Sequence, residues 1–189
     1  KGIILDVRNN GGGLLQNAIE IGSMFLKEGV IVYTVDREGK KETISSTGNI
    51  IWDKPIVMLI NESSASASEI LAGALHDNRK ATLVGTKSFG KASVQNVKQL
   101  EDGSAVLLTI AKYLTPNGTD IMKKGIEPDY AVEIPTAEVE ATPEAEEKAV
   151  DIEKDIQLKK ALEVLLKGGL TKVDIKTKVK ARKFSAVPL

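Results

Sequence analysis

The sequence lacks several residue types on which whole classes of function depend. Its 189 residues include no Cys and a single His, which excludes a disulfide framework, a thiol nucleophile and any thiolate or multi-histidine metal centre. Lys plus Arg and Asp plus Glu each number 26, so there is no basic excess to neutralise phosphates, and we expect no nucleic-acid partner. No apolar run approaches the roughly 18 residues of a membrane span.

The start of the chain is also unusual. Lys1-Gly2 runs at once into an apolar strand, without an initiator Met or a signal peptide. Such a start is typical of an excerpt from a longer protein, so the compartment is not readable from these residues. A hydrophobic content of 42% is typical of a globular domain.

Strand and helix patterns alternate over residues 1–134. Continuous apolar runs predict buried strands, and apolar residues at helical spacing predict amphipathic helices. The predicted buried strands are 3–7, 56–60 and 81–85; the helices are 14–26 and the segment around 70–75; the hairpin strands are 30–35 with 41–45 and 94–100 with 105–111. This alternation predicts an α/β domain that ends near Ile134.

The tail differs from the core in charge. Residues 133–155 hold nine acids and two lysines, whereas residues 159–183 hold nine basic residues and two acids. We expect an acidic linker over 135–150, then a helix and a basic, half-buried strand within 151–189. Solvated faces are the simplest interpretation of these charges, and a subunit contact between the opposite charges stays open.

Two turns follow core strands, at the edge where open α/β sheets usually place their sites. The first, residues 9–13, reads Asn-Asn-Gly-Gly-Gly and leads into a helix. Its backbone N–H groups suit an anion or a developing oxyanion, although the pattern has neither GxGxxG spacing nor a Walker lysine. A plain tight turn is the alternative.

The second turn, residues 61–69, is rich in serine. Ser66 stands between two alanines at a predicted helix start. In a nucleophile elbow the hydroxyl is likewise exposed at a helix N-terminus, and small neighbours leave room for a substrate carbonyl. The flanking residues are Ala rather than the Gly of a GxSxG motif. The alternative is ordinary, because a serine that precedes a glutamate by three residues caps helices well.

A nucleophilic serine needs a base. His76 lies ten positions along the same predicted helix, roughly 15 Å away, which excludes a Ser-His-Asp triad unless that helix breaks. A lysine can replace the histidine when burial keeps it neutral. Lys91, which follows an aromatic residue and a glycine, is the candidate, and Gln95 is placed to aim its amine. An exposed surface lysine is the alternative.

Four stretches together resemble the carboxyl-terminal processing peptidases, which are serine endopeptidases with a Ser-Lys dyad on a crotonase-like α/β core. The stretches are residues 1–13, 64–75, 88–91 with Gln95, and 124–129. They occur in the family's order and cover about residues 1–134. The resemblance therefore implies a crotonase-like core, extended here by a C-terminal helix and strand.

By this resemblance, Ser66 is the nucleophile and Lys91, 25 residues later, is the general base. Gln95 orients the lysine, and the backbone N–H groups of Gly12 and Ala67 form the oxyanion hole. Lys91 would take the Ser66 proton, Ser66 would attack a peptide carbonyl, and water would release the acyl-enzyme. We expect no metal, coenzyme or other cofactor.

The resemblance also implies features beyond the core. Relatives carry a signal sequence and a PDZ domain upstream, which binds substrate tails and gates the site. They work in the periplasm, cell envelope or lumen on proteins with unstructured C-termini. After about Glu138 the match is loose, chiefly at residues 155–158 and 161–162. In some relatives this C-terminal region helps to form a dimer, so a homodimer through 151–189 is a candidate.

Three positions depart from the family pattern. Gly11 stands where Pro is usual, Ala92 replaces a common Gly, and Ser63 stands where Gly or another small residue is usual. None removes a catalytic group. Two alternatives remain: a non-hydrolytic crotonase-like scaffold or binding module, and an acyl-CoA enzyme of the crotonase superfamily, which would need no Lys91 and would bind coenzyme A.

Overall fold

A parallel sheet of four strands forms the central layer of the molecule. The computed structural model describes residues 2–134 and 154–167. The strand order is β1-β4-β5-β8, with bounds Ile3–Asp6 for β1, Ile56–Ile60 for β4, Ala81–Gly85 for β5 and Tyr130–Ala131 for β8. Every residue of β4 is buried, as expected of a central strand covered on both faces.

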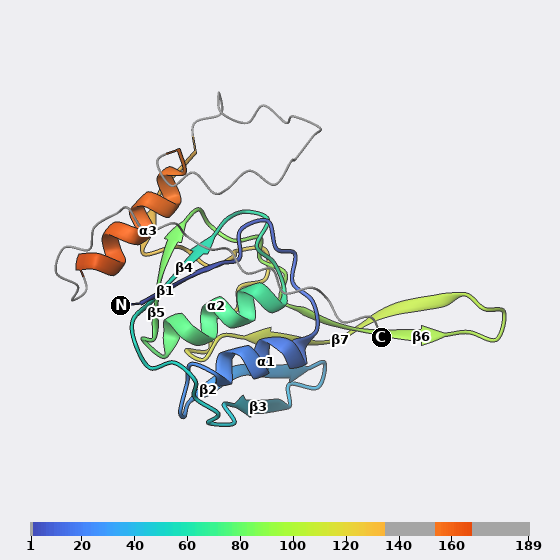
Figure 1. The fold of residues 1–189 in the computed structure, drawn as a ribbon. Coiled ribbons are helices and arrows are strands. Elements are labelled where there is room, and N and C mark those ends of the chain that lie inside the picture. Colours follow the sequence, from blue (N-terminus) through green and yellow to red (C-terminus); the bar gives the residue numbers. More distant parts are fainter. Residues whose placement is uncertain (1, 135–153, 168–189) are drawn as a thin grey trace.

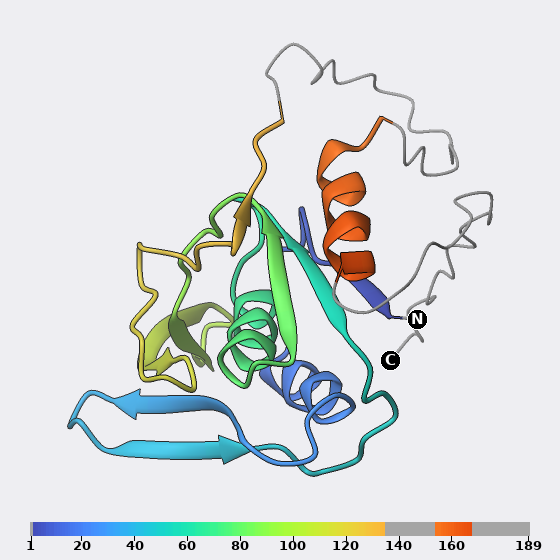
Figure 2. The same cartoon turned by 90° about the vertical axis from the view of Figure 1, so that its left-hand side faces the viewer.

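Helices cover both faces of this sheet (Figure 2). They are α1 (Leu15–Ser23), α2 (Ala67–Asp77) and α3 (Ile156–Lys167). Alternate residues of β4 point to opposite faces. Met58 and Ile60 belong to the core that includes α1 and α2, whereas Val57 and Leu59 pack in a second cluster with Ala161 of α3.

An antiparallel sheet lies on the other side of α1 and α2. Its order is β3-β2-β7-β6, with bounds Val30–Asp36 for β2, Lys41–Ser45 for β3, Ser93–Gln99 for β6 and Ala105–Leu114 for β7. Ile31 and Val32 of β2 are buried in the core shared with the helices. The β6–β7 hairpin extends away from the body, and Leu107 near its tip is 62% exposed (Figure 1).

These elements confirm the predicted α/β class, the two core helices and both hairpins. Strands β4 and β5 are buried as predicted, whereas β1 lies at the edge of the sheet and is only partly buried. The helix predicted within 151–189 is present as α3. The acidic linker and the basic strand lie outside the described residues. Within the two described ranges, no helix is long and apolar enough to cross a membrane.

Candidate active site

The two predicted site turns meet, because they follow adjacent parallel strands, β1 and β4. The Asn10 carbonyl accepts a hydrogen bond from the Ala65 N–H at 3.1 Å. Asn9 and Asn61 exchange two further hydrogen bonds, from Asn9 N to Asn61 Oδ1 at 2.9 Å and from Asn61 Nδ2 to Asn9 Oδ1 at 2.8 Å. The glycine turn is therefore fastened to the serine turn.

Gly12 lies against the nucleophile position. A Cβ added to Gly12 would stand 2.8 Å from both Ser66 Cβ and Ala67 N, and the glycine has a φ of +95°. Only glycine fits this conformation and this approach without strain. The Gly12 N–H donates to Asn10 Oδ1 at 2.9 Å, so a substrate oxygen that used this donor would have to displace the Asn10 carboxamide.

Ser66 sits at the start of α2 in a strained conformation. Its φ of 58° and ψ of −119° lie outside the regions that non-glycine residues usually occupy. Strain of this kind persists where the surrounding structure fixes it, and it is frequent at active sites. The position, directly before a helix N-terminus and beside Ala67, is that of a nucleophile elbow.

Glu69 ties the serine turn to the lysine segment. Its side chain is 1% exposed and accepts four hydrogen bonds. Oε2 accepts from the Ser66 N–H at 3.0 Å and the Lys91 N–H at 2.9 Å, and Oε1 accepts from the Gly90 N–H at 2.7 Å and the Ser88 hydroxyl at 2.5 Å. One buried carboxylate therefore fixes the backbone of both predicted dyad residues.

This role was not predicted, because the spacing of Glu69, three residues after Ser66, indicates only a helix-capping acid. A signal was present in the sequence. Glu69 is an acid within a run of small and apolar residues, 65–75, with no Lys or Arg one helical turn away on either side. A carboxylate in such a run must find donors elsewhere in the fold, since burying it unpaired costs several kcal/mol.

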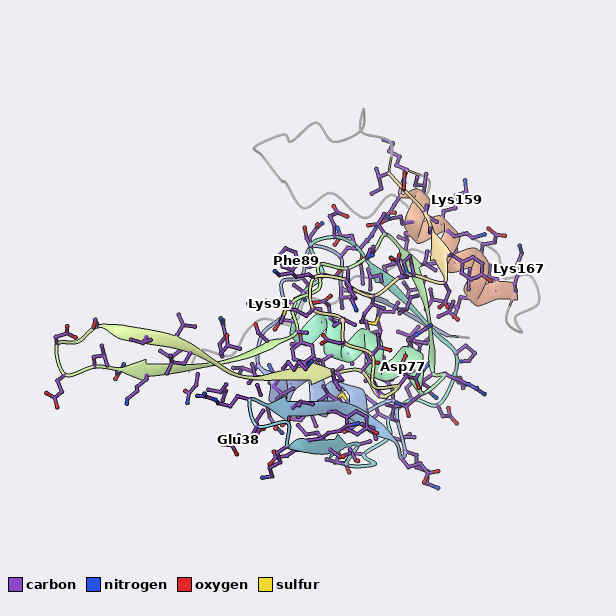
Figure 3. All side chains as sticks on the ribbon, turned by 180° about the vertical axis from the view of Figure 1, so that it is seen from behind. Glu38, Asp77, Phe89, Lys91, Lys159 and Lys167 are labelled. Carbon is purple, nitrogen blue, oxygen red and sulfur yellow. The ribbon has the colours of Figure 1, made fainter. Side chains whose placement is uncertain are left out.

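The backbone of Lys91 is fixed, but its side chain points to solvent. Lys91 is exposed, and within the described residues its ammonium makes no hydrogen bond or ion pair to Ser66 or to any other group. It lies near Phe89, at the base of the β6–β7 hairpin and away from Asp77 (Figure 3). Gln95 is exposed on β6. The sheltered lysine expected from the sequence is thus not seen, although its segment lies beside Ser66.

Tyr113 of β7 is a further buried group at this place. It is 3% exposed, and its hydroxyl makes no hydrogen bond of good geometry within residues 2–134 and 154–167. Burial raises the pKa of Tyr113, the negative charge of Glu69 adds to the rise, and the nearby Ser66 hydroxyl opposes it. The phenol therefore stays protonated beside the serine.

His76 lies at the opposite end of α2 from Ser66. The helix is unbroken from Ala67 to Asp77, so the break that would let His76 approach Ser66 is not present. Hydrogen bonding to Asp77, and then to Asp129, raises the pKa of His76 to about 9, against burial, which lowers it. A hollow of about 860 Å³ opens at this end, lined by His76, Asp129 and nine other residues, away from the candidate site.

The described residues offer no metal centre. Within residues 2–134 and 154–167, no group of three or more His, Asp or Glu side chains is close enough to hold a metal ion. The site instead combines a serine at a helix start, a lysine on the adjoining segment and backbone N–H donors. That set suits nucleophilic acyl transfer.

Comparisons with known proteins match the chain to peptidases. The model of peptidase family S41 matches residues 1–132. The carboxyl-terminal-processing protease of Synechocystis is 49% identical over 170 residues, 89% of this chain and 38% of that protein. The chloroplastic carboxyl-terminal-processing peptidase 3 of Arabidopsis thaliana is 49% identical over 67% of this chain and 25% of its own length.

A solved structure gives the same result. The photosystem II D1 C-terminal processing protease superimposes with a TM-score of 0.67 at 43% identity, covering 70% of this chain and 34% of that one. The chain thus spans between a quarter and two fifths of the length of these similar proteins.

Proposed function

This chain belongs to peptidase family S41, and we propose that it forms the catalytic part of a serine endopeptidase that cleaves protein substrates near their C-termini by a Ser-Lys dyad. The observation that carries the mechanism is the Glu69 carboxylate, which holds the Ser66 and Lys91 backbones at 3.0 and 2.9 Å. A fixed distance between two backbones is the first requirement of a nucleophile and its base.

The chemistry follows from these groups. Lys91 turns inward as a neutral amine, oriented by Gln95, and Nζ takes the proton of Ser66 Oγ as that oxygen attacks the peptide carbonyl carbon. The N–H groups of Gly12 and Ala67 stabilise the oxyanion once the Asn10 carboxamide has moved aside. Lys91 then gives its proton to the leaving amine, and a water molecule hydrolyses the ester of Ser66.

Substrate, location and assembly are part of the same proposal. The relatives' names mention C-terminal processing, and the Arabidopsis relative is named as chloroplastic. We therefore expect unstructured protein C-termini as substrates and an extracytoplasmic site of action, in the periplasm, cell envelope or lumen. A homodimer through residues 151–189 remains a candidate, with the opposite charges of 133–155 and 159–183 as its attraction.

The test uses the complete natural polypeptide that carries residues 1–189. Cleavage of an unfolded protein with an apolar C-terminus is compared for wild type, Ser66→Ala and Ser63→Ala. Ser63 is a matched control, because it is an exposed serine in the same turn. We expect Ser66→Ala to lower kcat at least about 10³-fold and Ser63→Ala to leave it unchanged.

Two results would overturn the proposal. Full cleavage by Ser66→Ala would show that Ser66 is not the nucleophile. Absence of cleavage by the folded wild type would favour a non-hydrolytic crotonase-like module. Binding of coenzyme A, measured by calorimetry on the same protein, would instead favour an acyl-CoA enzyme.

A further inference from the structure

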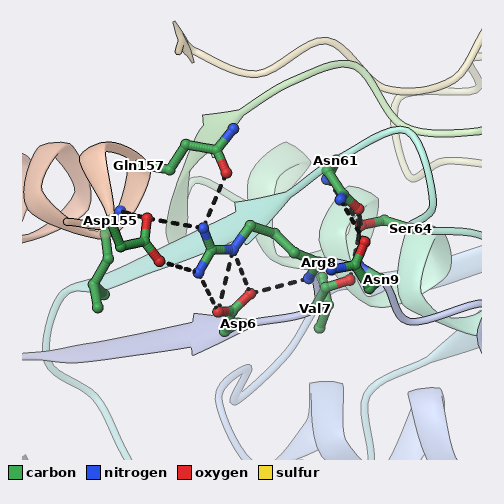
Figure 4. A network of polar contacts seen from close by, with 9 residues as sticks. Asp6, Val7, Arg8, Asn9, Asn61, Ser64, Asp155 and Gln157 are labelled. Carbon is green, nitrogen blue, oxygen red and sulfur yellow. Dashed lines mark hydrogen bonds and ion pairs between the residues drawn. The ribbon is translucent and has the colours of Figure 1, made fainter. Parts of the chain in front are cut away.

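Arg8 joins the end of β1 to the C-terminal helix. Its guanidinium makes a two-pronged contact with Asp155, from Nη1 to Oδ1 at 3.0 Å and from Nη2 to Oδ2 at 2.7 Å (Figure 4). Nη1 also donates to Gln157 Oε1 at 3.0 Å. The Arg8 side chain is only 14% exposed, so this fork is largely shielded from solvent.

Asp6 accepts the remaining donors of the same guanidinium. Nε lies 3.0 Å from Asp6 Oδ1, and Nη2 lies 2.7 Å from Asp6 Oδ2. Together with Asp155 and Gln157, these contacts engage all five N–H groups that an arginine possesses. The orientation of Arg8 is therefore fully specified, and a lysine, which lacks the planar fork, would not reproduce it.

On the helix side, the same residues hold α3 in place. Asp155 Oδ1 also accepts the Leu158 N–H at 2.9 Å, which caps the start of the helix. Gln157 is 1% exposed, and its Nε2 donates to the Val132 carbonyl at 2.7 Å. The residues that cap and dock α3 are thus the same residues that bind the Arg8 guanidinium.

On the turn side, Arg8 directly precedes the turn at 9–13, which Asn9 and Asn10 also fasten to the serine turn. Residues 9–13 are all exposed, and a Cβ added at Gly11 or Gly13 would meet nothing within 4 Å. Three consecutive glycines give this segment the greatest conformational freedom a chain can have. The three glycines make no side-chain contacts, so the order of this segment depends on the hydrogen bonds of Asn9 and Asn10 and on the anchoring of Arg8 before them.

We propose that Asp155 and Gln157 are positioning residues of the peptidase: by binding Arg8, the docked helix α3 helps to hold the glycine turn, and with it Gly12, against Ser66. The proposal rests on the proposed function. It makes the segment after the core part of the active-site framework, and it links catalytic rate to whether α3 is docked.

The central test is steady-state kinetics of Asp155→Asn in the complete natural polypeptide. Asparagine caps a helix as well as aspartate does, but it loses the charge and one acceptor of the fork. We expect kcat to fall about tenfold with KM unchanged. A displacement of 1 Å at an oxyanion donor can lower the rate about 10²-fold, and we expect Asp155→Asn to displace the Gly12 N–H by less than that.

A double-mutant cycle tests whether Arg8 transmits the effect. Arg8→Lys keeps the positive charge and loses the fork, so we expect a similar fall in kcat. Because both changes break one connection, the double variant should be no slower than the slower single variant. Multiplication of the two effects would overturn transmission through Arg8.

Two control variants on α3 separate positioning from stability. Glu163→Gln removes exposed ion pairs to Lys160 and Lys167, and Leu165→Val removes apolar packing. We expect Leu165→Val to lower Tm at least as much as Asp155→Asn while kcat stays at the wild-type value, and Glu163→Gln to change neither.

The outcomes distinguish this inference from the proposed function. Wild-type activity that depends on Ser66, together with full kcat in Asp155→Asn, overturns the positioning role alone. A fall in kcat that tracks Tm across all α3 variants also overturns it, in favour of a purely structural helix. Cleavage that does not depend on Ser66 overturns the proposed function itself.

Discussion

The two ends of helix α2 use carboxylates in opposite ways. At the first end, Glu69 is buried and accepts only from backbone N–H groups and the Ser88 hydroxyl. At the other end, His76 is one-third exposed and lies between Asp77 and Asp129, at 3.4 and 3.0 Å. Glu69 fixes the backbone geometry by accepting hydrogen bonds from neutral groups. The contacts of His76 with Asp77 and Asp129 are ion pairs, which form only when the imidazole is protonated and therefore depend on pH.

The helix dipole explains why each group suits its end. A helix N-terminus stabilises negative charge, so an oxyanion that develops beside Ser66 and Ala67 is favoured there. A helix C-terminus stabilises positive charge, and the protonated imidazole of His76 benefits. The one histidine is thus placed where it can stabilise the fold, away from the serine and lysine of the proposed dyad.

The largest effect is expected when the proposed general base, Lys91, is removed near the Ser66 end of α2. We expect Lys91→Ala to lower kcat at least about 10³-fold, and to cause no further loss when combined with Ser66→Ala, because the two residues act as a unit. Lys87→Ala is the matched control, since Lys87 is an exposed lysine of the same segment paired with Glu127. Rates are measured on an unfolded protein. Comparable turnover by Lys91→Ala would contradict the dyad.

The next effect concerns the carboxylate at the first end. Glu69→Gln presents an NH₂ group to buried donors, so at least one pair of donors loses its acceptor. We expect kcat to fall about 10²-fold and the free energy of unfolding to fall by about 2–4 kcal/mol. Urea denaturation measures the second quantity. Glu62→Gln is the control, because Glu62 is exposed and accepts one hydrogen bond, from Thr86. Full activity in Glu69→Gln would separate the network from catalysis.

A smaller effect is expected where the site reaches the hairpin. Gln95→Ala weakens the orientation of Lys91 but leaves both proton carriers in place, so kcat should fall about tenfold. Gln99→Ala, on the same strand and equally exposed, should leave kcat unchanged. Equal effects of the two variants would show that the hairpin acts as a whole rather than through Gln95.

Local patterns predicted most of the fold. The apolar run at 56–60 became a fully buried strand, and the two predicted strands at 94–100 and 105–111 paired as a hairpin, because these patterns depend on neighbours in the sequence. The turns at 9–13 and 61–69 meet because parallel neighbouring strands end at one edge, which the strand order alone implies.

The remaining parts depend on distant pairs. Arg8 and Asp155 lie 147 residues apart, and no periodicity links them, so their fork emerges only from the docking of α3. The spacing of Glu69 predicts a capping residue. Its hydrogen bond from the Gly90 N–H depends on where the segment after β5 lies relative to α2. The orientation of the Lys91 side chain is likewise a property of packing, not of its own segment.

The smallest effect is expected at the second end of α2. Asp77 first, and then Asp129, hold the pKa of His76 at about 9, above its ordinary 6.5. The stabilisation is therefore complete below about pH 6.5 and is lost as pH rises through 9. Because the ring is one-third exposed, solvent screens the pair, and His76→Gln should lower the free energy of unfolding by about 1 kcal/mol or less at pH 6 and hardly at all at pH 10. Urea titrations at both pH values measure this, and kcat should match wild type at each. A loss of kcat in His76→Gln would show that the histidine takes part in catalysis, and the two ends of α2 would then not differ in function.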